Sequence, residues 1–177
     1  MKHINILHTK IYSTTKDFVE LTEIISNLTG DNIDLLAKLM DLETTYPDFY
    51  KWYIFKVVPD LRYRPSKRKI LLAISDIYDD GSIVKRLSGL AILKITAKEK
   101  KICTFRVFPE YRSQRVGSIL IKQCMSFLET TKPLISISEK ALVSFEPFIH
   151  KYEWTLCQSL PDYYKEGITE YVFNGFF

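Results

Sequence analysis

The spacing of hydrophobic residues differs between the first 65 residues and the rest of the chain. In the first 65 residues, apolar positions recur every three or four residues, a spacing that is typical of amphipathic helices. From residue 68 onward, apolar residues alternate with polar ones or form short runs, which is typical of strands. A short apolar segment, INILHT (residues 4–9), stands ahead of the helical part and predicts one further strand.

The first helix is predicted between a polar run and a glycine. Ser13, Thr14 or Thr15 can cap its N-terminus, because a side-chain oxygen accepts a hydrogen bond from the free amides of the first turn. Gly30 can end the helix in the left-handed conformation that glycine tolerates. The predicted buried face carries Phe18, Leu21, Ile24, Ile25 and Leu28.

Two more helices are expected before residue 65. Asp31 or Asn32 can cap the second, whose apolar stripe consists of Ile33, Leu36, Leu39 and Met40. The third lies in PDFYKWYIFKVVPDL (residues 47–61) and is expected to end before Pro59, because the residue before a proline disfavours the helical conformation. Its aromatic residues are interpreted as core and wall rather than as a ligand cage: Phe49, Tyr50, Trp52, Tyr53 and Phe55.

The remainder of the chain predicts strands interrupted by two helices. RKILLAIS (residues 68–75) and LSGLAILKIT (residues 87–96) are expected to pair, because Asp79-Asp80-Gly81 between them is a hairpin signal. KKICTFRVF (residues 100–108) adds a third antiparallel strand. The elements expected after it are a helix at 115–129, a strand at 133–138, a helix at 139–152, and strands at 154–160 and 168–175.

This order of elements predicts a mixed α/β (α+β) fold. A strand–helix–strand crossover inside an otherwise antiparallel series gives a mostly antiparallel sheet flanked by helices. With 177 residues, 46% of them apolar, the chain fits one domain with its own core. We therefore expect one domain over residues 1–177, made of a helical segment (1–65), a central core (68–130) and a strand–helix–hairpin segment (131–177).

Composition excludes several classes of protein. The N-terminus lacks the apolar segment of a signal peptide, and no window approaches eighteen consecutive apolar residues, so no membrane association is expected. The three cysteines, Cys103, Cys124 and Cys157, have a spacing that matches neither a disulfide framework nor a zinc site. We therefore expect a cytoplasmic protein without a bound metal.

Positive charge is concentrated in the middle of the chain. Residues 56–125 carry 16 Lys and Arg against 6 Asp and Glu, a net charge of +10, whereas the two flanking parts are each at −3. This distribution is compatible with an ordinary solvated surface. It is equally compatible with a field that attracts a phosphorylated cofactor or a nucleic acid.

The segment FPEYRSQRVGSIL (residues 108–120) is the clearest candidate for a binding site. It leads from the end of a predicted strand through a short basic loop into a helix. The first amides of a helix have no intrahelical partner and the helix dipole is positive there, so such a loop can bind an anion. Arg112, Ser113 and Arg115 would add donors to that site.

The stretch SGLAILKITAKEKKICTFRVFPEYRSQRVGSILIKQCMSFLE (residues 88–129) resembles the core of the GCN5-related N-acetyltransferase (GNAT) superfamily. In that family a strand is followed by an Arg/Gln-x-x-Gly-x-Gly/Ala loop and a helix. The predicted order of elements is similar to the family's from end to end. FIHKYEWTL (residues 148–156) stands where the family often has a Phe-Tyr-x-x-x-Gly-Phe pattern. The resemblance is dense over residues 68–130, and residues 10–65 match only in being helical.

The resemblance implies acetyl-CoA, or another acyl-CoA, as cosubstrate. Residues 68–130 would be the acetyl-CoA-binding core and residues 1–65 the acceptor side. The pantetheine arm would pair with the backbone of Phe105, Arg106 and Val107. The pyrophosphate would lie on the loop amides, those of Arg112, Ser113, Gln114, Arg115, Val116, Gly117 and Ser118.

Arg115 is a departure from the family motif, since it replaces the first glycine, whereas Gly117 keeps the second. If residue 115 is right-handed helical, arginine costs little there and adds a charge facing the phosphates. If it needs a positive φ, the cost is about 1–2 kcal/mol.

The catalytic groups are less clear from the sequence. Acetylation of an amine requires a base for the ammonium and an acid for the leaving thiolate. Family members often use a tyrosine of the last helix as that acid, and Ile149 stands at its position here. The strand residues 101–108 also lack the carboxylate that the family frequently uses as base. The candidate replacements are Tyr152, Glu139 and His150, then Tyr163 or Tyr164, and a water relay is also open.

The leading interpretation is an N-acetyltransferase that acts on a primary amine of a small molecule, a protein or an aminoacyl-tRNA. A tRNA would contact the basic middle section, in which RYRPSKRK (residues 62–69) is the densest cluster. The alternative is a non-catalytic GNAT-fold module that binds CoA, nucleic acid or a protein partner. An interaction module that uses the aromatic segment 49–55 is a third interpretation. Open strand edges leave room for a homodimer.

Overall fold

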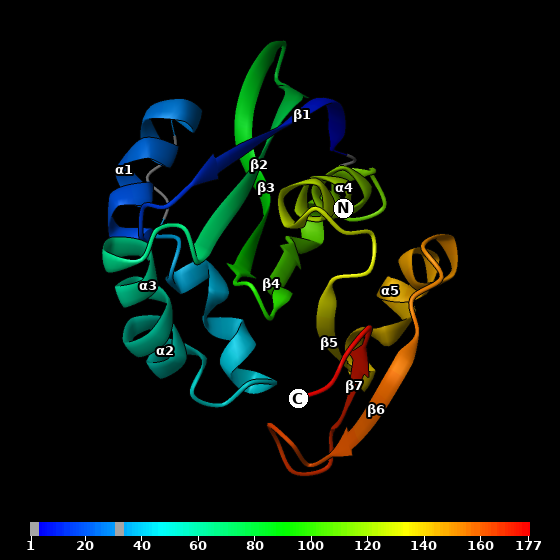
Figure 1. The fold of residues 1–177 in the computed structure, drawn as a ribbon. Helices are drawn as coiled ribbons and strands as arrows, with labels where there is room; N and C mark the ends of the chain where they lie inside the picture. The colour runs from blue at the N-terminus through cyan, green and yellow to red at the C-terminus, as the bar shows by residue number, and fades with distance from the viewer. Residues whose placement is uncertain (1–3, 31–33) are drawn as a thin grey trace.

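The computed structural model describes residues 4–30 and 34–177. In that part of the chain, seven strands form one sheet in the order β1-β2-β3-β4-β5-β7-β6 (Figure 1). β4 and β5 run parallel, and the other neighbouring strands run antiparallel. The strands are β1 (Asn5–Thr14), β2 (Arg68–Asp79), β3 (Ser82–Ile95), β4 (Lys100–Val107), β5 (Leu134–Ser138), β6 (Leu156–Pro161) and β7 (Thr169–Phe173). The predicted fold class, a mixed and mostly antiparallel sheet flanked by helices, is therefore confirmed.

Helices cover both faces of this sheet (Figure 1). They are α1 (Phe18–Thr29), the 3₁₀ helix η1 (Ala37–Thr44), α2 (Phe49–Trp52), the π turn η2 (Tyr53–Val57), α3 (Val58–Tyr63), the 3₁₀ turn η3 (Pro109–Tyr111), α4 (Val116–Leu128) and α5 (Glu139–Lys151). Alternation along β2 separates two cores, since Ile70 and Leu72 pack with α1–α3 whereas Leu71 packs with α4 and β5. The apolar residues in the middle of β2 and β3 are thus buried on both faces, whereas Tyr78 and Ile83 beside the hairpin turn are exposed.

The start of α1 differs from the prediction. β1 extends to Thr14, so Ser13 and Thr14 belong to a strand and do not cap the helix. The cap is the buried Asp17, whose carboxylate accepts hydrogen bonds from the amides of Val19 (3.0 Å) and Glu20 (3.3 Å). The end of α1 is as predicted, because Gly30 adopts a left-handed φ of 74°.

The second and third helices also differ from the prediction. The proposed caps Asp31 and Asn32 lie outside the described residues, and the chain then forms a 3₁₀ helix, η1. The expected stop before Pro59 is wrong, because the helical chain continues from α2 through η2 into α3. Pro59 is the second residue of α3 and directly follows the π turn η2.

The β2–β3 hairpin is confirmed. Asp79 pairs with Ser82, and the two residues between them, Asp80 and Gly81, have φ values of 47° and 82°. Positive φ at both positions is the requirement of the tight turn that matches strand twist. Both strands are longer than predicted, whereas the elements after β3 end within two residues of their predicted bounds.

Candidate functional site

β4 and β5 pair only near their N-terminal ends and then separate. They pair only at Lys101 with Leu134 and at Ile102 with Ile135. The β3–β4 register shifts next to this point, and Cys103 is the extra residue of a bulge in β4. Beyond the bulge, β4 has no partner on the β5 side in the described chain. This open edge can pair with an extended ligand.

The register shows which backbone groups face the open edge. The amide of Phe108 donates to the carbonyl of Ser88 (3.0 Å), and Arg106 is the partner of Leu90. The backbone amide and carbonyl groups of Phe108 and Arg106 therefore point toward β3. Alternation then turns the peptide groups of Phe105 and Val107 toward the open side. Of the three strand residues predicted to bind the pantetheine arm, the structure therefore places Phe105 and Val107 at the edge. Arg106 instead directs its side chain to an ion pair with Asp41 of η1.

The basic loop after β4 alternates in backbone conformation. Ser113 has a φ of 60° and Arg115 a φ of 66°, while Arg112 between β4 and these residues is extended. No side chain caps α4, and within residues 4–30 and 34–177 the amides of residues 113–118 have no hydrogen-bond acceptor. Successive free amides at the start of a helix form a site for an anion.

Arg115 takes the less favourable of its two anticipated conformations. Its left-handed φ costs about 1–2 kcal/mol relative to an unstrained residue. Its charge also lies at the positive end of the α4 dipole, and in the described structure no carboxylate pairs with it. The helix dipole therefore destabilises the Arg115 cation, and a bound anion would offset this electrostatic cost.

Two other side chains of the loop bind within the protein. Gln114 accepts a hydrogen bond from the Ile6 amide (3.3 Å) and donates to the Glu110 carbonyl (3.5 Å), which attaches the loop to β1. Arg112 donates from Nε to the Val107 carbonyl (3.3 Å). Arg112 thus occupies an acceptor that an extended ligand on β4 would use, and it must move when such a ligand binds.

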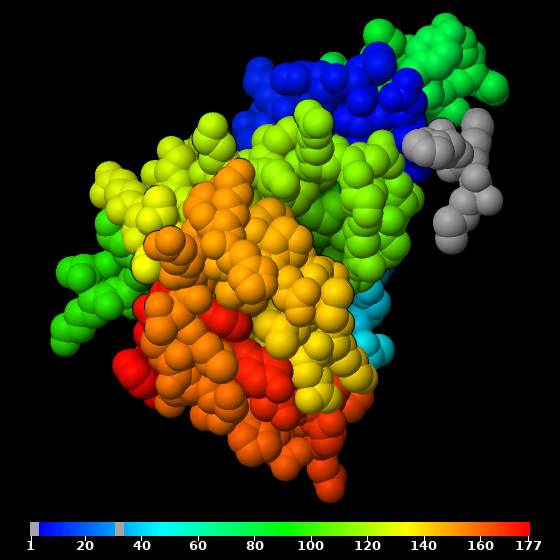
Figure 2. Space-filling view, turned by 90° about the vertical axis from the view of Figure 1, so that its right-hand side faces the viewer, coloured from blue at the N-terminus to red at the C-terminus, as the bar shows by residue number. Residues whose placement is uncertain are grey.

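α5 forms the opposite side of this region. Its Phe145 and Phe148 pack edge-on against Phe105 of β4, with ring centroids 5.5 and 6.3 Å away. A Cβ on Gly117 would lie 3.5 Å from Phe148 and 3.6 Å from Val107, which are ordinary contacts. Figure 2 shows green atoms of the central strands recessed between the yellow-green loop and α4 and the gold α5.

A buried polar cluster lies on the other face of the sheet. Ile135 and Ile137 of β5 pack toward α4 and α5, so the alternating Ser136 and Ser138 face the N-terminal helices. Glu170 of β7 pairs with Ser138 and shares that face. Its side chain is only 3% exposed.

Two tyrosines complete this cluster. The hydroxyl of Tyr46, between η1 and α2, donates to Oε1 of Glu170 (3.4 Å), and the Tyr46 ring contacts Tyr164 edge-on (5.3 Å). Burial raises the pKa of Glu170, while hydrogen bonds from Ser136 and Tyr46 and the charge of Lys101 partly offset that rise. Burial likewise raises the pKa of Tyr164 to about 12. A buried carboxylate with a raised pKa is a stronger base than an ordinary one.

Glu170 is not among the site residues predicted from the sequence. The available signal was its position in ITEYVFNG, where Glu170 and Val172 occupy alternate positions of one strand and both are buried. A carboxylate at an inward-facing strand position is rarely structural unless it is paired.

The three catalytic residues predicted from sequence do not come together. Glu139 is exposed at the first residue of α5, and His150 is exposed in its last turn. The 13 residues of α5 span about 20 Å, so these two side chains cannot act on one atom. Tyr152 follows the helix and stacks on Trp154, with ring centroids 6.3 Å apart.

The basic cluster RYRPSKRK is largely neutralised within the protein. Arg62 pairs with Asp17 (2.7 Å), and Arg64 and Arg68 both pair with Asp60 (2.6 and 2.8 Å). Three of its five cations therefore have internal partners, which reduces its value as a surface for a polyanion.

Residues 4–30 and 34–177 contain no group of three or more His, Cys, Asp or Glu side chains arranged to hold a metal ion. None of their helices combines the length and the apolar character needed to cross a membrane.

Comparison with known proteins identifies the fold through solved structures and not through sequence. The sequence matches no protein-family model and has no significant match among curated proteins. The structure is similar to that of Arabidopsis thaliana NAA60 in complex with acetyl-CoA, with a TM-score of 0.61 and 14% identity over 94% of this chain and 97% of that one.

Two bacterial structures are similar over the same share of this chain. For the ribosomal-protein-S18-alanine N-acetyltransferase from Escherichia coli, the TM-score is 0.55 at 12% identity, with 92% of that chain covered. For an acetyltransferase of the GNAT family from Streptococcus pneumoniae, it is 0.52 at 15% identity, with 98% covered. The chain therefore has the GNAT fold over nearly its whole length.

Proposed function

We propose that this protein is an N-acetyltransferase that transfers the acetyl group of acetyl-CoA to a primary amine. One observation carries the proposal: only the short segment 108–115 separates the open edge of β4 from the N-terminus of α4, which no side chain caps, so a strand-like surface and a candidate anion site are adjacent along the chain. A cosubstrate with an extended amide-containing arm and a pyrophosphate has the chemistry to use both.

The residues at this site fit acetyl-CoA. The arm would pair with the backbone of Phe105 and Val107, and the pyrophosphate would accept hydrogen bonds from the amides of residues 113–118. Arg115, together with an Arg112 released from Val107, would supply the balancing charge. When bound, the cosubstrate supplies a thioester that is reactive toward amines.

Glu170 is the base that this arrangement favours. Its Oε1 can accept a proton from the acceptor's ammonium, directly or through the Tyr46 hydroxyl that already donates to it. In the described structure neither Glu139 nor His150 nor Tyr152 forms a hydrogen bond or ring contact with this cluster. We assign the base to Glu170 for that reason and retain Tyr152, on the α5 side, as a candidate donor to the thiolate.

The test is calorimetric titration with acetyl-CoA and with CoA. We expect micromolar binding that Gly117→Trp abolishes, because an indole would fill the space in front of the α4 amides. Gly117→Ala is the matched control, since its Cβ would make only ordinary contacts at 3.5 and 3.6 Å. Absence of heat from the wild-type protein at millimolar ligand would refute the proposal.

Turnover separates an enzyme from a binding module. Release of free CoA thiol is measured with a panel of primary amines. Binding without release of thiol for any amine would favour the non-catalytic alternative, in which the fold serves as a CoA sensor.

A further inference from the structure

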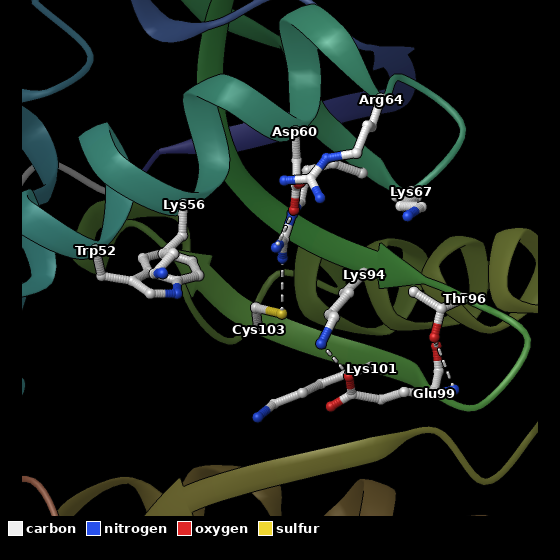
Figure 3. Close-up of a pocket in the computed structure, with 11 residues that line it drawn as sticks. Trp52, Lys56, Asp60, Arg64, Lys67, Lys94, Thr96, Glu99, Lys101 and Cys103 are labelled. Atoms are coloured by element: carbon white, nitrogen blue, oxygen red, sulfur yellow. Dashed lines mark hydrogen bonds and ion pairs between the residues drawn. The ribbon is translucent and has the colours of Figure 1, made fainter.

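An open, cationic pocket of about 480 Å³ lies between the N-terminal helices and the sheet (Figure 3). α2, η2 and α3 form one wall, and the neighbouring ends of β2, β3 and β4 form the other. Its cations are Lys56, Arg64, Lys67, Arg68, Lys94 and Lys101, against two carboxylates. Three of these cations, Arg64, Lys67 and Arg68, belong to the RYRPSKRK cluster, and none of the six belongs to the proposed CoA site.

Both carboxylates of the pocket are already occupied. Asp60 pairs with Arg64 and Arg68, as described above, and Glu99 pairs with Lys94. In residues 4–30 and 34–177, Lys56, Lys67 and Lys101 have no carboxylate partner. The pocket therefore keeps a clear excess of uncompensated positive charge.

Arg68 gives a second, independent sign of a missing acceptor. It is only 4% exposed, and its buried Nε, like that of Arg106 outside the pocket, has no hydrogen-bond partner among residues 4–30 and 34–177. Besides Asp60, its guanidinium contacts Cys103 Sγ (3.3 Å), which is a weak acceptor. Buried donors without partners are rare in native proteins, because the lost hydration is not replaced.

Lys101 connects this pocket to the proposed active site. It lies on β4 in the short stretch that pairs with β5, and although burial raises the pKa of Glu170, the charge of Lys101 offsets a small part of that rise. Burial lowers the pKa of Lys101 itself, and its ammonium lies 3.7 Å from the ring centroid of Phe177. Cys103, two residues along the strand, lines the pocket at the bulge.

We propose that the acceptor is a small primary amine that carries a compact dianionic group, either a phosphate monoester or a pair of carboxylates, which binds in this pocket. The inference rests on the proposed function for the transfer step and deepens it by naming the acceptor class. A pocket of this volume, with Trp52 as a side wall (Figure 3), suits a small molecule better than a nucleic acid.

The transfer step balances with the groups named. The ammonium of the acceptor gives one proton to Glu170, and the nitrogen lone pair then forms a C–N bond with the acetyl carbon. The C–S bond breaks with its electron pair on sulfur, and the second proton of the amine passes to that thiolate. The anion in the pocket takes no part in the bond changes and orients the amine.

The binding experiment uses the full chain without acetyl-CoA. Inorganic phosphate and O-phosphoethanolamine are titrated calorimetrically into the wild-type protein and into the Lys56→Met/Lys67→Met double variant. We expect the double variant to bind both at least about tenfold more weakly, because it loses two of the pocket's unpaired cations. Lys140→Met, an exposed lysine of α5 outside the pocket, is the matched control and should bind like wild type. Equal affinities in wild type and double variant, or no binding to either, would overturn the proposal.

The kinetic experiment compares O-phosphoethanolamine, glutamate, ethanolamine and spermidine as acceptors. We expect kcat/KM to be at least about tenfold higher for one of the two anionic amines, which tells phosphate from carboxylate, and the double variant to lose that preference. Equal or better turnover of the neutral or polycationic amines would overturn the proposal, as would acetylation of aminoacyl-tRNA alone. Failure of the proposed function is distinguishable, because it would abolish acetyl-CoA binding and leave phosphate binding intact.

Discussion

Replacing Glu170 with glutamine should make the protein more stable at neutral pH and much less active. Glu170 lies on β7 and is 3% exposed, and the burial of its carboxyl group raises its pKa above the value it has in the unfolded chain. The side-chain amide of the variant would keep the hydrogen bond to Tyr46 and would carry no charge to bury. One substitution therefore tests the structural environment and the catalytic role separately.

The effect on stability has a defined sign. Between the unfolded and the folded pKa of Glu170, the native state holds a proton that the unfolded state has lost, so wild-type stability falls as pH rises through this window. The loss is about 1.4 kcal/mol for each pH unit between the two pKa values. Below the unfolded pKa the wild-type protein and Glu170→Gln should have similar free energies of unfolding, and above it the variant should be the more stable.

The measurements are urea unfolding from about pH 4 to pH 8 and initial rates over the same range. For the variant, we expect the free energy of unfolding to lose this pH dependence and kcat to fall about 10²–10⁴-fold, as is usual when a general base is removed. The acid limb of the wild-type rate profile should lie above the ordinary carboxyl range. If Glu170→Gln retains the wild-type kcat, Glu170 is not the base. If the variant is less stable than wild type at neutral pH, the buried carboxylate does not destabilise the folded protein.

Three further predictions concern the fold and the cosubstrate site. Gly89→Ala should lower the free energy of unfolding in urea by about 1–3 kcal/mol and weaken acetyl-CoA binding, because its Cβ would lie 2.6 Å from the Arg106 carbonyl; unchanged stability would contradict this close packing. Arg115→Gly should raise the melting temperature slightly, since relief of about 1–2 kcal/mol of strain exceeds the added flexibility of the unfolded chain. It should also reduce the affinity for CoA several-fold and make that affinity less dependent on salt. Calorimetry at two salt concentrations tests this, and an unchanged affinity and salt dependence would show that Arg115 does not contribute to CoA binding. Asp17→Ala should cost about 1–2 kcal/mol in urea unfolding because α1 loses its cap, whereas Asp17→Asn should recover part of that loss.

Local residue patterns are sufficient to predict many of the elements. The positive φ values of Asp80 and Gly81 are a local requirement of a two-residue turn, and the left-handed Gly30 is a local requirement of a helix end. The basic loop before α4 is also predictable, because strand, short loop and amphipathic helix follow one another in sequence. Each of these features depends on contacts between residues only a few positions apart.

The wrong predictions within the N-terminal part have a common cause. Three hydroxyl residues compete with Asp17 as cap of α1, and only the length of β1 along β2 decides which residue leaves the sheet. Pro59 predicts a stop because its predecessor disfavours helix, yet packing of Val57 and Leu61 in the core retains the chain as a π turn followed by α3. Tertiary contacts here outweigh a preference of the backbone.

The order of the elements, the mixed sheet and the basic loop before α4 follow from the amino-acid sequence alone. Three other features exist only in the folded chain: the point where β4 leaves β5, the meeting of Glu170 with Tyr46 across 124 positions, and the contact of Arg68 with Cys103. The physical reason is that a strand's register and a bulge decide which side chains share a face. The packing of the two cores selects both the register and the bulge. That packing brings together residues from distant parts of the chain, so no short stretch of sequence can specify it.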